Sequence, residues 1–150
     1  MTFYYGIDPG PRSGCVCVIS DFGETFEFLL LRDSTPADVF DFLRGFESLR
    51  GGVLEDVGAC RPGQGLGSQS KLILNAGEMK GVCSCMTVPF QFIRALTWRK
   101  MLGLATAKST AERKKLNKDL AQRLYPDIPV TADKVDALLL AHAATQLYTR

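Results

Sequence analysis

The chain has 150 residues, of which 46% are hydrophobic and 23% charged, and its formal net charge is +2. This composition is typical of a soluble globular protein, and the length fits one domain, residues 1–150, with a substantial core. No apolar run is long enough to span a bilayer, and no basic segment precedes an apolar one as in a secretion signal. We therefore expect a cytoplasmic protein with no membrane partner.

The cysteine pattern argues against both disulfides and zinc. Five cysteines, an odd number in a chain without a secretion signal, favour free thiols. Cys15 and Cys17 form one C-x-C pair and Cys83 and Cys85 another, whereas structural zinc sites use the spacing C-x2–4-C. The single histidine, His142, lies in an apolar run and is expected to be a helix residue rather than a ligand.

Charge is distributed unevenly along the chain. Residues 1–60 carry four Lys and Arg against ten Asp and Glu, whereas residues 94–123 carry nine basic residues against two acidic ones. A basic segment beside acidic positions suits a protein that acts on a polyanion. A solvated helix face would carry the same charges, so the distribution alone leaves both interpretations open.

Three strands are predicted at the start, over 3–8, 14–19 and 25–31, because aromatic and β-branched residues alternate between tight turns. The turns at 9–10 and 21–23 are short, which favours an antiparallel meander. A helix is predicted to begin after Thr35 at its N-cap, and Gly51-Gly52 is predicted to end it. The remaining predicted elements are a strand at 53–57, a glycine-rich loop at 58–67, a helix at 68–82, a strand at 86–88, and helices at 95–102, 110–124 and 132–148.

This order predicts an α/β fold with a mixed five-stranded sheet, its first three strands antiparallel, flanked by helices. The glycine-rich loop matches neither G-x4-G-K-[ST] nor G-x-G-x-x-G. We therefore expect no small-molecule cofactor.

Four carboxylates stand where a packed domain does not need them. Asp8 ends the first strand, Glu55 interrupts the fourth, and Asp133 and Asp136 lie three residues apart at the start of the last helix. Asp8 could be a turn residue, and the two helix aspartates could complement the helix dipole. A buried Glu55 is harder to explain without a partner.

Convergence of these carboxylates would require a counterion. At about 4 Å and an effective dielectric of 20, each pair repels by roughly 4 kcal/mol. A proton or a cation relieves such repulsion, and oxygen-only ligands suit Mg²⁺ or Mn²⁺. Two such ions about 3.5–4 Å apart are the usual catalysts of phosphodiester hydrolysis.

Three segments resemble the RuvC family of Holliday-junction resolvases, which have a ribonuclease H-like fold. They are GIDPG at 6–10, VLEDV at 53–57 and ADKVDALLLAHAA at 132–144, in the order and separation of that family. The resemblance implies a homodimeric, Mg²⁺-dependent endonuclease that resolves four-way DNA junctions by paired symmetric nicks. By motif, Asp8, Glu55, Asp133 and Asp136 would be the catalytic carboxylates that bind two Mg²⁺ ions, with Mn²⁺ as a substitute.

The resemblance also implies a basic residue near the active site, ahead of the last helix. Lys114 or Lys115 is the candidate for steadying the scissile phosphate, and Lys118 remains open. Trp98 either stacks on a base or lies in the core. The DNA-binding candidates are Arg12, Arg61, Arg99, Lys100, Lys108, Arg113 and Lys118.

One departure from the family concerns substrate choice. Better-known relatives carry an aromatic residue shortly after the catalytic Glu, whereas residues 58–67 contain none. Relaxed activity on other branched DNA or on RNA–DNA hybrids is therefore an alternative, and a non-catalytic junction-binding protein is another. Two symmetric nicks require two active sites about a two-fold axis, and we expect the 68–82 helix to form the homodimer interface.

Overall fold

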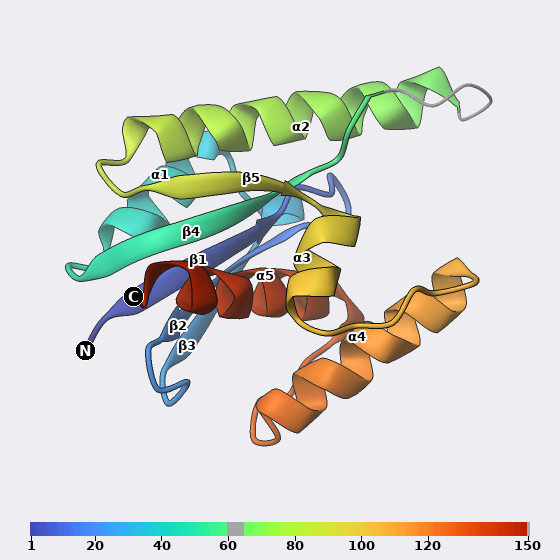
Figure 1. Ribbon diagram of the computed structural model, residues 1–150. Coiled ribbons are helices and arrows are strands. Elements are labelled where there is room, and N and C mark those ends of the chain that lie inside the picture. Colours follow the sequence, from blue (N-terminus) through green and yellow to red (C-terminus); the bar gives the residue numbers. More distant parts are fainter. Residues whose placement is uncertain (60–64, 150) are drawn as a thin grey trace.

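The computed structural model describes residues 1–59 and 65–149, and its centre is a five-stranded mixed sheet (Figure 1). The strand order is β3-β2-β1-β4-β5; β1, β2 and β3 pair antiparallel, and β4 and β5 run parallel to β1. The strands are β1 (Phe3–Asp8), β2 (Cys15–Ser20), β3 (Phe26–Leu30), β4 (Leu49–Asp56) and β5 (Phe90–Arg94). The predicted sheet is confirmed.

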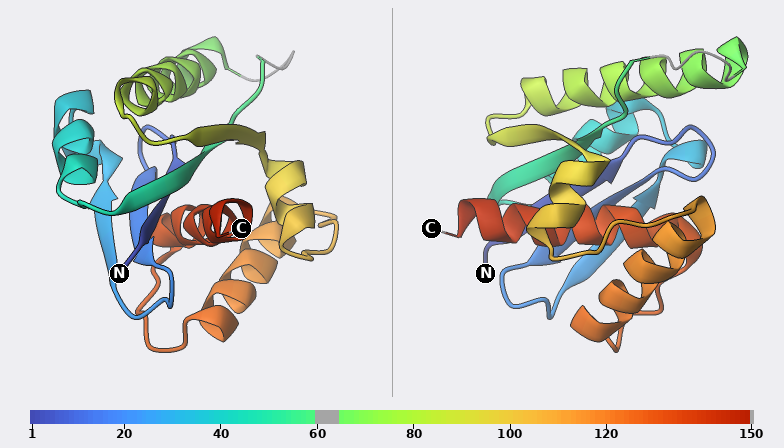
Figure 2. Two further views of the ribbon diagram at one scale, coloured as in Figure 1. Left: turned by 60° about the vertical axis from the view of Figure 1, so that its left-hand side comes forward. Right: turned by 45° about the vertical axis from the view of Figure 1, so that its right-hand side comes forward.

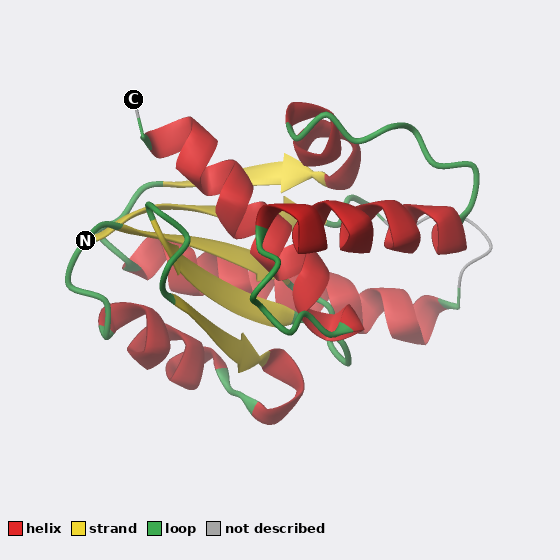
Figure 3. Ribbon diagram, turned by 90° about the horizontal axis from the view of Figure 1, so that it is seen from below, coloured by secondary structure: helices red, strands yellow, loops and turns green. Residues whose placement is uncertain are grey.

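Helices cover both faces of this sheet (Figures 2 and 3). Helices α1 and α2 lie on one face, and α3, α4 and α5 lie on the other. The helical elements are η1 (Leu31–Asp33), α1 (Pro36–Arg44), α2 (Leu66–Cys85), α3 (Ala95–Met101), α4 (Thr110–Leu124) and α5 (Ala132–Tyr148). None of the helices in the described ranges is long and apolar enough to cross a membrane.

Strand alternation divides the core into two layers. On β2, Cys15, Cys17 and Ile19 pack toward α5, whereas Val16 and Val18 pack toward α1 and α2. The C-x-C pair Cys15 and Cys17 therefore lies on one buried face of β2. The four cysteines within the described residues are free thiols. The fifth, Cys60, lies outside the described residues.

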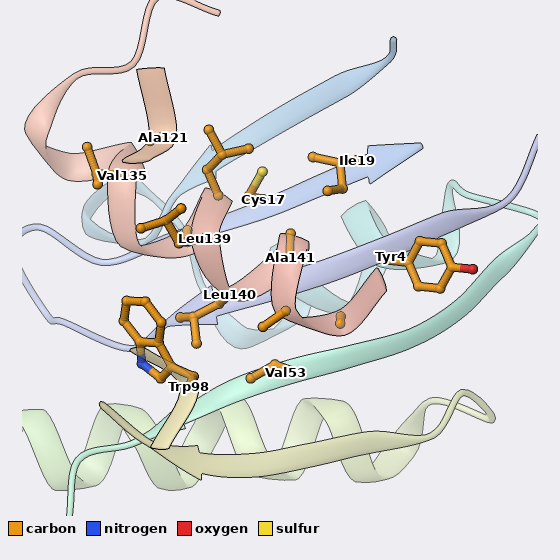
Figure 4. Packing of buried hydrophobic residues seen from close by; sticks show 14 of the residues in the cluster. Tyr4, Cys17, Ile19, Val53, Trp98, Ala121, Val135, Leu139, Leu140 and Ala141 are labelled. Carbon is orange, nitrogen blue, oxygen red and sulfur yellow. The ribbon is translucent and has the colours of Figure 1, made fainter. Parts of the chain in front are cut away.

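Helix α5 is the buried centre of its layer (Figure 4). Eight of its residues are buried, so it is apolar nearly all round rather than amphipathic. The prediction that His142 is a helix residue is confirmed: it lies in α5, and its Nδ1 shares a hydrogen bond of 2.7 Å with the Tyr125 hydroxyl.

Thr35 begins helix α1 as predicted. Its hydroxyl accepts a hydrogen bond from the Asp38 backbone N–H, and the Asp38 carboxylate accepts one from the Thr35 N–H. The helix ends at Arg44, however, and the prediction that Gly51-Gly52 ends it was wrong. Both glycines lie inside β4, because the ring of Tyr5 covers one and the ring of Tyr148 the other.

Two further boundaries differ from the prediction. The fifth strand runs over Phe90–Arg94 and not over 86–88, since it pairs with Gly52–Asp56 of β4 only after Pro89. Helix α2 begins at Leu66, inside the segment predicted as a loop, and extends to Cys85.

Candidate active site

The parallel strands bring the first two carboxylates together. Ile7 of β1 pairs with Leu54 of β4, so Asp8 and Glu55 follow side by side at the same edge of the sheet. Both fall on the face that Tyr4 and Val53 share beneath α5, because side chains alternate along a strand. In Figure 1, β4 and β5 run toward the end of the molecule where α3 lies, away from both termini.

A glycine places the third carboxylate. A Cβ atom at Gly6 would lie 2.2 Å from the Ala141 nitrogen and 2.4 Å from the Ala137 oxygen, so α5 lies directly on the backbone of β1. One residue before Ala137, Asp136 therefore reaches the end of the strand that carries Asp8. Asp8, Glu55 and Asp136 form the group that we call the carboxylate cluster.

The surroundings of Asp8 and Glu55 favour protonation of these two carboxylates when no cation is bound. Burial raises the pKa of Asp8 to about 8, and the charges of Glu55 and Asp136 add to this rise. A hydrogen bond of 3.2 Å from the Gly10 N–H and the charge of Arg113 oppose it. Burial likewise raises the pKa of Glu55 to about 7, with Asp136 contributing in the same direction.

Asp133 is placed differently from the other predicted carboxylates. Its Oδ2 lies 3.6 Å from Nη1 of Arg32, which follows β3, and about a third of its side chain is exposed. The charges that raise the pKa of Asp8 are those of Glu55 and Asp136. The structure thus places three of the four predicted carboxylates where their charges act on one another, and it places Asp133 beside a basic partner.

The chemistry of the carboxylate cluster fits a divalent cation, although the oxygens are not gathered around one point. Within residues 1–59 and 65–149, no three His, Cys, Asp or Glu side chains are close enough together to form a metal-ligand set. The cluster nevertheless offers hard oxygen donors whose mutual repulsion a cation would relieve. Binding would require these side chains to move toward one another.

Two buried side chains contact the carboxylate cluster: Trp98, for which the sequence predicted no contact with a carboxylate, and Asn117, which sequence reasoning did not identify. Trp98 donates a hydrogen bond of 2.9 Å from Nε1 to Oε2 of Glu55, and Asn117 donates one of 2.8 Å from Nδ2 to Oδ1 of Asp136. A lone buried Trp needs a partner for its N–H, and Asn117 shares a helix face with the buried Leu120 and Ala121. The sequence carries these two signals of burial, but not which carboxylates the side chains contact, because that depends on how α3 and α4 pack.

Arg99, which was predicted to bind DNA, is buried in the free protein. Arg99 is only 4% exposed, since its guanidinium donates to Oδ1 of Asn117 and to the Ala105 carbonyl, the latter at 3.1 Å. Trp98 is 1% exposed and lies in the core, the second of its two predicted positions (Figure 4).

The other basic candidates lie on the surface. Arg113, on α4, is the basic residue whose charge lowers the pKa of both Asp8 and Glu55. The prediction for Arg61 falls outside the described residues. The remaining exposed candidates are Arg12, Lys100, Lys108, Lys114, Lys115 and Lys118.

Comparison of the sequence with protein-family models and with curated proteins found no match. Among solved structures, the chain is similar to RuvC of T. thermophilus in complex with a Holliday junction substrate, with a TM-score of 0.68 and 14% sequence identity. The match covers 95% of this chain and 92% of that one. At this identity the likeness concerns the fold, and it shows that the chain has a ribonuclease H-like α/β fold.

Proposed function

We propose that this protein is a metal-dependent endonuclease that resolves four-way DNA junctions by paired nicks, with residues 1–150 as one nuclease domain. The carboxylate cluster at the ends of β1, β4 and α5 is the observation that carries the proposal. Buried carboxylates that raise one another's pKa destabilise the metal-free fold, so their presence is best explained by a bound cation.

Asp8, Glu55 and Asp136 would hold Mg²⁺, or Mn²⁺ in its place, and Asp133 would join them by leaving Arg32. Two ions held there would activate a water and stabilise the leaving oxygen of the phosphodiester. The charge of Arg113 lowers the pKa of both Asp8 and Glu55. We propose that Arg113 contacts the scissile phosphate. Lys114 and Lys115 follow it on α4 and remain candidates.

We propose DNA as the polyanion that the basic surface binds. Exposed basic residues lie along α4 and the segment before it. They are close in sequence to Asn117, which contacts the carboxylate cluster. The related fold of T. thermophilus RuvC was solved with a Holliday junction, which supports branched DNA as the substrate class.

We propose a homodimer that uses helix α2. Its outer face exposes Leu66, Ile73 and Leu74, and Gly77 and Gly81 have open space where a side chain would stand. An apolar groove of about 390 Å³ runs beside this face, lined by Pro36, Ala37, Phe40, Glu78, Gly81, Val82 and Cys85. Two-fold pairing of this face would place two carboxylate clusters in one assembly.

A junction-binding protein without nuclease activity is the second candidate. It is favoured by the Arg32–Asp133 ion pair and by carboxylate oxygens that are not gathered for a metal. Weighing against it, the cluster is costly to keep and serves no purpose in binding DNA.

The test is digestion of four substrates by the purified protein in Mg²⁺ and in EDTA. The substrates are a mobile four-way junction, a fork, an RNA–DNA hybrid and a linear duplex, with the products mapped on every strand. We expect symmetric nicks in two opposed strands of the junction, and none in EDTA. Equal cutting of the linear duplex would contradict junction selectivity, and binding without nicking in Mg²⁺ or Mn²⁺ would favour the second candidate.

A further inference from the structure

We infer that the short helix α3 positions the carboxylate cluster through two adjacent residues: Trp98 holds Glu55 directly, and Arg99 holds Asp136 through Asn117. This inference rests on the proposed function, because it assigns these side chains to the preparation of a metal site. Three elements that are separate in sequence, β4, α4 and α5, meet at this one turn of α3.

The Trp98 contact is built into the core. The indole is 1% exposed and packs with buried side chains that include Val53 and Leu140, as Figure 4 shows. Its single donor points to Oε2 of Glu55 at 2.9 Å. Because packing fixes the ring, the N–H fixes that carboxylate oxygen.

The Asn117 contact has a defined direction. Arg99 can only donate, so the oxygen of the Asn117 amide must face Arg99 and the NH₂ group must face Asp136. Asn117 is 2% exposed and Arg99 is 4% exposed, and the Ala105 carbonyl accepts a further bond from Arg99. The buried guanidinium thus locks the orientation of the amide that holds Oδ1 of Asp136.

The side chains that donate to Glu55 and Asp136, Trp98 and Asn117, are neutral, so they orient the carboxylates without neutralising them. A Lys or Arg in direct contact would neutralise a carboxylate and compete with a cation, as Arg32 does at Asp133. An indole N–H and an amide NH₂ orient one oxygen without cancelling the negative charge. The second oxygen of Glu55 and of Asp136 can then serve as a metal ligand.

The experiment compares Trp98→Phe and Asn117→Ala with a matched control, Tyr125→Phe. The control also removes one buried hydrogen bond, to His142 in α5, but away from the cluster. For each protein we would measure Mn²⁺ binding by titration calorimetry, the Mg²⁺ concentration that gives half-maximal junction cleavage, junction binding in EDTA, and the melting temperature.

We expect both test variants to bind Mn²⁺ at least about tenfold more weakly than the wild type and to need correspondingly more Mg²⁺ for half-maximal cleavage. Junction binding in EDTA should be retained. Tyr125→Phe should keep the wild-type Mn²⁺ affinity even though its melting temperature falls. Wild-type Mn²⁺ affinity in Trp98→Phe, which keeps an aromatic ring in the core, would overturn the inference even if Asn117→Ala does not fold. Failure of the wild type itself to bind Mn²⁺ or to cleave would instead overturn the proposed function.

Discussion

Asp8 is the residue on which burial and like charge act most strongly within the carboxylate cluster. The charges of Glu55, on β4, and Asp136, on α5, raise its pKa, and the opposing groups are a single backbone N–H from Gly10 and the charge of Arg113. In the metal-free protein these surroundings favour the neutral carboxyl. Cation binding at the carboxylate cluster would therefore displace a proton, and metal affinity would depend on pH.

The first prediction concerns the stability of the metal-free protein against pH. The pKa of Asp8 is raised from 3.8 to about 8 and that of Glu55 from 4.5 to about 7. Between about pH 4 and pH 8 the folded state therefore binds more protons than the unfolded state. Stability should be greatest near pH 4 and should fall as the pH rises to about 8. Urea unfolding in EDTA at several pH values measures this.

Asp8→Asn serves as the comparison, because it removes the titrating group while keeping its shape. Its unfolding free energy should exceed that of the wild type at pH 8 and should vary less with pH. A wild-type protein that is more stable at pH 8 than at pH 5 in EDTA would contradict this account of the cluster.

The second prediction compares the neighbouring basic residues of α4. Arg113→Ala should lower junction cleavage more than Lys114→Ala or Lys115→Ala, because the Arg113 charge is the one that acts on Asp8 and Glu55. Single-turnover cleavage at saturating Mg²⁺ measures the difference, with junction binding as the control for general loss of charge. A larger defect in either lysine variant would return the phosphate-contacting role to the residue first predicted from the sequence.

At the scale of elements, the approach of α5 to β1 sets the position of Asp136. That approach depends on Gly6, because a Cβ there would overlap the backbone of Ala137 and Ala141. A backbone cannot rotate away as a side chain does, so the helix would have to move.

The third prediction follows from this contact. Gly6→Ala should lower the unfolding free energy by about 1–3 kcal/mol or more, since one added methyl group must displace a packed helix. Gly67→Ala is the matched control: it lies in the first turn of α2 with open space around it, and its stability should be unchanged or higher by at most about 1 kcal/mol. Chemical denaturation measures both, and equal stabilities would show that the approach of α5 is not tight.

The elements that were correctly predicted are those with strong local signals. Alternation and turns located the first three strands, and the Thr35 capping box located the start of α1. Tertiary packing decided what local signals could not. The glycines at 51 and 52 look like a helix end, yet they lie in a strand because two aromatic rings need the space above and below them.

The same division applies to the site. Strand positions and helix spacing singled out Asp8, Glu55 and Asp136, and the resemblance to the RuvC family implied their common role. The burial of Arg99 and the role of Asn117 depend on how α3 and α4 pack, which no local pattern records. Asp133 lies three residues before Asp136 as expected, but Arg32 of η1 pairs with it.

At the scale of the whole molecule, the exposed face of α2 bears on assembly. Leu74 is 65% exposed in the middle of this helix, and Gly81 borders the apolar groove. Because paired nicks need two active sites, assembly and the outcome of the reaction are linked.

The fourth prediction separates folding from assembly. Gly81→Leu should leave the protomer folded, since nothing lies within 4 Å of a Cβ at that position, but should convert a dimer to a monomer. The monomer should nick junctions singly instead of in pairs. Light scattering after gel filtration and strand mapping measure these outcomes, with Gly81→Ala as the control that adds one carbon. A wild-type protein that is monomeric both free and on DNA would remove the dimer from the proposal.

The most direct measurement is junction cleavage and junction binding by Asp8→Asn beside the wild type in Mg²⁺. Removing one negatively charged oxygen ligand while leaving the basic surface of α4 intact should abolish cleavage and keep the dissociation constant for the junction within about threefold, or about 0.6 kcal/mol. Undiminished Mg²⁺-dependent cleavage by Asp8→Asn would contradict the claim that the carboxylate cluster is the hydrolytic centre.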